Sequence, residues 1–94
     1  MNYLETLLNP TTQLSWKKSE GQPCYHAFKG EIFYNLCKYI DPTTNRTIFS
    51  LNIDDLKKYI KNVEDLTIND SHEYYDSIRE IYDYAQSNFS TIAA

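Results

Sequence analysis

The segment CYHAFKGEIFYNLCKYI, residues 24 to 40, decides the fold because its apolar side chains suit either a helix or a strand. On a helical wheel most of them share one broad half, and a smaller polar set lies opposite. That polar set is Glu31, Tyr34, Asn35 and Lys38. As a strand, the segment would carry nearly equal apolar content on both faces, with Asn35 and Lys38 on opposite sides. We therefore predict an amphipathic helix over 24–40, with a strand as the alternative.

Two further helices are predicted on the C-terminal side. Asn52 resembles an N-cap, with Asp55 three residues later, and the apolar spacing that follows predicts a helix over 52–63. Asp70 and Glu73 resemble a capping box at the start of a last helix over 71–88.

The remaining elements are short. Residues 2–8 have helical spacing and predict one helical turn. The β-branched and aromatic run at 47–51 predicts a strand that pairs with 13–18 in a two-stranded ribbon. Residues 1–94 are thus expected to form a single α+β domain that is mostly helical.

Composition narrows the class of protein. The chain of 94 residues is 41% hydrophobic, which suffices for a small core without a metal or disulfides. No apolar run approaches the roughly 20 residues of a membrane span. The segment MNYLETLLNP lacks a positively charged region and includes Pro10, so no secretory signal is expected. We expect a protein of a bacterial cytoplasm without membrane contact.

Charge is distributed unevenly. Residues 1–62 hold eight Lys/Arg and six Asp/Glu, whereas residues 63–94 hold one Arg and seven acids. The predicted last helix places acidic side chains on one face, opposite its apolar stripe, and Tyr84 projects from the same side. The predicted partner-binding residues are Glu73, Asp76, Glu80, Asp83 and Tyr84. A solvated outer face is the alternative interpretation of these acids.

A basic cluster provides a second candidate surface. Lys57, Lys58 and Lys61 fall on one side of the predicted 52–63 helix. As a phosphate-binding patch it lacks arginines and a glycine-rich loop. Ordinary solvation is the favoured interpretation of this cluster. It could also contact the acidic face of another copy, which makes a homodimer an option.

Catalytic and metal chemistry have little support. Cys24, His26, Cys37 and His72 match no familiar zinc spacing, and no nucleophile, nucleotide-binding or metalloprotease motif occurs. In a helix over 24–40 the two cysteines would lie about 20 Å apart, so free thiols are expected. We expect no enzyme activity, no cofactor and no metal.

The expected function is that of a small acidic binding or inhibitor protein. Its carboxylate-bearing helix would dock on a basic protein surface, including one that normally holds nucleic acid, as phage inhibitors of host defence enzymes do. The alternative is a winged-helix-like nucleic-acid-binding module that uses Lys57, Lys58 and Lys61. Direct contact of the acidic last helix with phosphate is disfavoured by charge repulsion.

Overall fold

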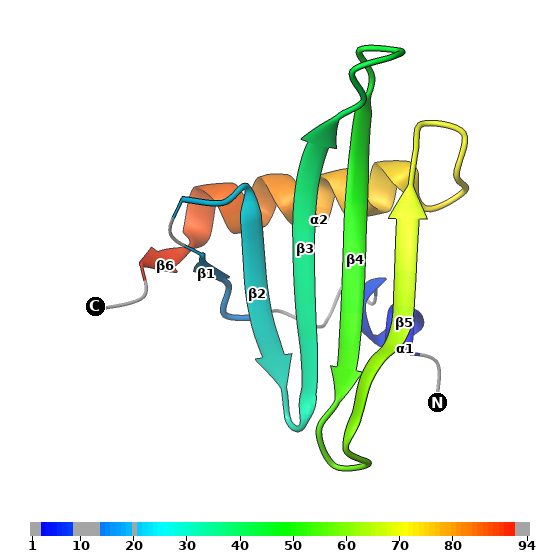
Figure 1. The fold of residues 1–94 in the computed structure, drawn as a ribbon. Coiled ribbons are helices and arrows are strands. Elements are labelled where there is room, and N and C mark those ends of the chain that lie inside the picture. Colours follow the sequence, from blue (N-terminus) through cyan, green and yellow to red (C-terminus); the bar gives the residue numbers. More distant parts are fainter. Residues whose placement is uncertain (1–2, 9–13, 20, 92–94) are drawn as a thin grey trace.

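A computed structural model describes residues 3–8, 14–19 and 21–91. In chain order the elements are α1 (Tyr3–Leu8), β1 (Lys17–Lys18), β2 (Cys24–Lys29), β3 (Ile32–Ile40), β4 (Thr47–Asp55), β5 (Ile60–Ile68), α2 (Tyr75–Asn88) and β6 (Ser90–Thr91). The strands form one sheet in the order β5-β4-β3-β2-β1-β6. Neighbours from β1 to β5 are antiparallel, and β6 joins β1 in parallel. Both helices lie behind the sheet in the view of Figure 1.

The prediction of a mostly helical fold is wrong, and the segment 24–40 shows why. It forms β2, a two-residue turn and β3, paired from Cys24↔Cys37 to Lys29↔Ile32. Gly30, the first residue of that turn, has a φ of 59°. A glycine with positive φ at this position is typical of a tight hairpin, so Gly30 marks a turn in the middle of the predicted helix.

The predicted helix over 52–63 is also wrong. Its first four residues end β4, in which Phe49, Leu51 and Ile53 alternate as buried side chains with partly exposed ones between them. Residues 56–59 form a hairpin loop, and β5 begins at Ile60. Asn52 is therefore a mid-strand residue, and its side chain donates to Asp65 on β5 at 2.8 Å instead of capping a helix.

The two-stranded ribbon is wrong as well. Lys17 and Lys18 pair with His26 and Tyr25 of β2, not with 47–51, which belongs to β4 between β3 and β5. Residue 13 of the predicted ribbon lies outside the described residues. The strand signal at 47–51 was correct, but its partners are β3, which was predicted to be helical, and β5, whose first four residues fell in the predicted 52–63 helix.

The two remaining predicted helices are present. The turn over 2–8 is α1, with residue 2 outside the described residues. The last helix begins at Tyr75, later than expected, and no side chain caps its first turn. Asp70 forms an ion pair with Arg46 at 2.9 Å. The turn before α2 is closed by the His72 backbone N–H, which donates to the Asn69 carbonyl, and by the Tyr74 N–H, which donates to the His72 ring.

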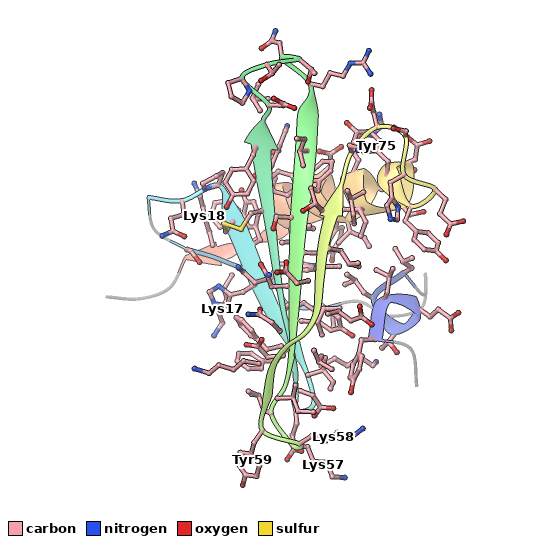
Figure 2. The ribbon with its side chains drawn as sticks, turned by 45° about the vertical axis from the view of Figure 1, so that its right-hand side comes forward. Lys17, Lys18, Lys57, Lys58, Tyr59 and Tyr75 are labelled. Carbon is pink, nitrogen blue, oxygen red and sulfur yellow. A yellow bond between two sulfur atoms is a disulfide. The ribbon has the colours of Figure 1, made fainter. Side chains whose placement is uncertain are left out.

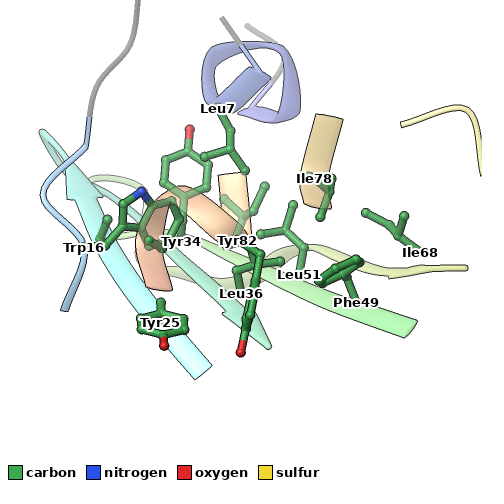
Figure 3. Close-up of a cluster of buried hydrophobic side chains, with 13 residues drawn as sticks. Leu7, Trp16, Tyr25, Tyr34, Leu36, Phe49, Leu51, Ile68, Ile78 and Tyr82 are labelled. Atoms are coloured by element: carbon green, nitrogen blue, oxygen red, sulfur yellow. The ribbon is translucent and has the colours of Figure 1, made fainter. Parts of the chain in front are cut away.

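The core lies between the sheet and the two helices (Figure 3). The sheet contributes fully buried side chains from its central strands, and α2 contributes Ile78, Tyr82 and Ala85. Tyr82 packs against Tyr25 of β2 and Phe49 of β4, with ring centroids 5.2 and 5.5 Å apart. Aromatic pairs at such separations stabilise a small core beyond simple area burial. One sheet face is therefore covered by helices.

Cys24 and Cys37 form a disulfide, which overturns the prediction of free thiols. They are opposite each other on β2 and β3, with Cα atoms 4.0 Å apart. The next pair outward is hydrogen-bonded from Lys38 N–H to the Pro23 carbonyl, so the cysteines occupy the close, non-hydrogen-bonded position. Disulfides persist in oxidising compartments, so this disulfide argues against the predicted cytoplasmic location. The location itself stays a prediction.

Candidate functional site

The acidic face, defined as Glu73, Asp76, Glu80, Asp83 and Tyr84, is turned to solvent. Asp76, Glu80 and Asp83 lie on the side of α2 opposite Ile78, which faces the sheet. Glu73 sits in the turn that precedes α2 rather than on the helix. Tyr84 is 44% exposed, so an aromatic ring with a hydroxyl group accompanies the carboxylates.

Little in the structure neutralises this face. Asp76 pairs with Arg79 at 3.5 Å, one turn apart, and both side chains are more than half exposed. Such a surface pair contributes at most about 0.5 kcal/mol. Among the residues that the structure describes, no other ion pair reaches the acidic face. The carboxylates of Glu80 and Asp83 are thus available to a basic partner.

The predicted basic cluster lies on the β4–β5 hairpin, not on a helix. Lys57 and Lys58 belong to its loop and Lys61 to the start of β5, and Figure 2 places Lys57 and Lys58 beside Tyr59 at one end of the molecule. Tyr59 is 95% exposed, and its φ of 58° is unusual for a bulky residue. Two of the three helices of the predicted winged-helix layout, 24–40 and 52–63, are replaced by strands and turns, so this alternative loses its structural basis.

A shallow hollow of about 340 Å³ lies beside this hairpin and is lined in part by Tyr3 and Asp55. The Tyr3 hydroxyl donates to the buried Asp55 carboxylate at 2.7 Å. That hydrogen bond is the main cause that lowers the pKa of Asp55 and raises the pKa of Tyr3. The backbone N–H of Lys58 also donates to Asp55, at 3.2 Å. Asp55 therefore joins α1 to the hairpin, and each of its two carboxylate oxygens accepts a structural hydrogen bond.

The cysteines and histidines are not gathered into a metal site. Cys24 and Cys37 are consumed in the disulfide, and His26 and His72 lie on β2 and in the turn before α2. No cluster of three or more potential metal ligands occurs within the described ranges. Burial, and secondarily the neighbouring Lys17, lower the pKa of His26, which also lies 3.3 Å from the Ser19 hydroxyl.

A third surface carries no sequence motif. The open face is defined as the sheet face turned away from α1 and α2, and it includes Phe28, Phe33 and Tyr39. Phe28 is 55% and Tyr39 48% exposed. The rings of Phe28 and Phe33 are tilted against each other with centroids 4.9 Å apart, and the centroid of the His26 ring lies 5.6 Å from that of Phe33. In 24–40, both sets of alternate residues are rich in apolar side chains, which is the sequence signal for an open face of this kind. The same feature favoured a helix over a strand in the prediction.

Comparisons with known proteins do not assign this chain to a family. No family model, curated protein or solved structure matches this chain. No helix within the described ranges has both the length and the apolar character required to cross a membrane.

Proposed function

We propose that this chain is a non-enzymatic binding protein that docks its acidic face on a basic surface of a protein partner. The observation that carries the proposal is the position of Asp76, Glu80 and Asp83 on the solvent side of α2, opposite the residues that pack on the sheet. Their charges do not serve the core. Carboxylates held on one side of a rigid helix repel each other, and a basic partner removes that repulsion.

The spacing of these carboxylates supports one class of basic surface. Successive acids along α2 rise by about 5 Å, which is comparable to the distance between phosphates in a nucleic-acid strand. A protein groove that normally holds a nucleic acid therefore matches both the sign and the spacing of the acidic face. Tyr84 adds an exposed aromatic ring, a residue type that concentrates binding energy at interfaces.

The test is affinity capture with matched charge variants. Glu80→Lys reverses one charge on the acidic face, and Glu31→Lys makes the same change at an exposed site in the β2–β3 turn. We expect a basic protein to be captured at low salt and released at high salt, because exposed charges are screened. Glu80→Lys should lose this partner while Glu31→Lys retains it. Equal capture by both variants would rule out the acidic face as the contact.

A broader variant tests the whole surface. Neutralising Glu73, Asp76, Glu80 and Asp83 to their amides should abolish capture and leave the circular dichroism spectrum unchanged, since these side chains point away from the core. A folded quadruple variant that still binds the same partner would show that the acids only solvate α2.

A further inference from the structure

The open face contains a row of polar side chains whose two ends carry opposite charge. Strand pairing places one residue from each of five strands side by side: Lys17, His26, Asn35, Asn52 and Asp65. Lys17 and Asp65 are exposed, and the three central residues are partly buried. The row thus runs from a cation on β1, through an imidazole and two amides, to a carboxylate on β5.

Apolar side chains flank this row on both sides along the strands. Phe28 pairs with Phe33 toward the β2–β3 turn, and Tyr39 pairs with Ile48 toward the β3–β4 turn. An antiparallel sheet with one solvated face normally shows polar residues there, whereas strands that are apolar on both faces are covered on both. β3 has the second pattern, with Leu36 buried on the helix side and Tyr39 half exposed on the other.

We propose that the open face is the interface of a homodimer in which two copies pack face to face about a twofold axis parallel to β3. Strands are about 4.8 Å apart, so β1 and β5 each lie roughly 10 Å from β3, on opposite sides. The twofold rotation exchanges these sides. Lys17 of one copy then lies over Asp65 of the other, His26 over Asn52, and Asn35 meets its own copy near the axis.

The charge pattern selects a second copy over an unrelated partner. The same row supplies both the cation and the matching acid, at equal distances from the central strand, which is the condition for an isologous interface. The area is also of the right order. β3, β4 and β5 have nine residues each, β2 has six and β1 has two. At about 3.3 Å per residue and about 4.8 Å per strand, they cover roughly 550 Å² before side-chain relief is added. Stable interfaces bury about 800 Å² per partner.

This dimer goes beyond the proposed function and does not depend on it. The acidic face lies on α2, behind the sheet, so face-to-face packing leaves the two acidic faces exposed at opposite ends of the dimer. The dimer is tested with the purified protein alone, and its failure would leave the binding proposal untouched.

The first experiment measures the mass of the purified, oxidised protein by sedimentation equilibrium over a wide concentration range. We expect a monomer–dimer equilibrium. Lys17→Glu and Asp65→Lys should each weaken dimerisation by about tenfold, because each substitution disrupts two symmetry-related pairs. The double variant Lys17→Glu/Asp65→Lys should recover most of the loss, since the exchanged charges again face each other.

The controls make the same charge changes elsewhere. Arg79→Glu and Glu80→Lys alter exposed residues of α2 and should leave the dimer unchanged. Phe28→Ser removes an exposed ring from the open face and should weaken the dimer without unfolding the monomer. A monomer at every concentration, or a dimer that responds equally to the α2 controls, overturns the proposal. A dimer weakened by both single reversals but not restored in the double variant also overturns the stated symmetry.

Discussion

Cys24 lies directly opposite Cys37 on the neighbouring strand, and the bond between their sulfur atoms closes the β2–β3 hairpin from its open end. The two residues are 13 positions apart in sequence. Cross-linking a loop of that size stabilises a fold by about 3 kcal/mol, mainly by restricting the unfolded chain.

Reduction should therefore lower the free energy of unfolding by about 3 kcal/mol in urea titrations. The double variant Cys24→Ser/Cys37→Ser should show the same loss and no response to the reductant. Thiol titration of the denatured, unreduced protein should detect no free cysteine thiol. A variant as stable as the oxidised protein would contradict a stabilising role.

The β2–β3 hairpin also explains why a helix was predicted for 24–40. The apolar residues of 24–40 fit a helical wheel because both alternations of the two strands are apolar, which blurs the twofold period. Gly30 was the local evidence for the correct fold, since a hairpin needs a residue that accepts positive φ and a helix does not. A helix over 24–40 also placed the cysteines far apart, so the disulfide could not be inferred.

The last helix could be predicted because the pattern that indicates it lies within one continuous segment. The period of residues 75 to 88 is that of a helix with one apolar stripe, and Ile78, Tyr82 and Ala85 are buried as that stripe requires. The exposure of Glu80 and Asp83 follows from the same period. Strand partners, in contrast, depend on residues distant in sequence. The residues around Lys17 contain no pattern that indicates pairing with His26.

Tyr59 should be replaceable by glycine with a gain in stability. Its φ of 58° costs about 1–2 kcal/mol for a residue with a side chain, part of which is offset by the greater freedom of glycine when unfolded. We expect Tyr59→Gly to raise the free energy of unfolding by about 1 kcal/mol. Tyr59→Ala keeps the strain and should change it by less than about 0.5 kcal/mol, because the ring is almost fully exposed. If glycine instead destabilises the protein, the tyrosine ring makes contacts that stabilise the hairpin.

The Tyr3–Asp55 hydrogen bond should make stability depend on pH on both sides of neutrality. The pKa of Asp55 is lowered in the folded protein, so its contribution is present above the ordinary value of 3.8 and is lost as pH falls through the folded pKa. The pKa of Tyr3 is raised, so its contribution is lost as pH rises above the ordinary value of 10.0. The contact should contribute most between these limits.

Tyr3→Phe provides the measurement, because it removes the donor and keeps the ring. Urea unfolding should show the variant to be less stable than the unmodified protein at pH 7. The difference should shrink as pH is lowered below about 4 and as it is raised above about 10. A difference that is constant across the whole range would mean that the hydroxyl acts without the Asp55 carboxylate.

Two tyrosines of β3 distinguish the strand from the helix that the sequence favoured. The helix puts Tyr34 on the polar half and Tyr39 on the apolar half, whereas the strand leaves Tyr34 0% and Tyr39 48% exposed. Tyr34 also donates its hydroxyl to the Tyr3 carbonyl at 3.0 Å. Tyr34→Ala should therefore cost about 3–5 kcal/mol of unfolding free energy, the loss typical of a large buried aromatic residue. Tyr39→Ala should cost less than about 1 kcal/mol when measured on dilute monomer. The reverse order of the two losses would restore the helix over 24–40 and remove the open face with it, because that face exists only if β3 is a strand.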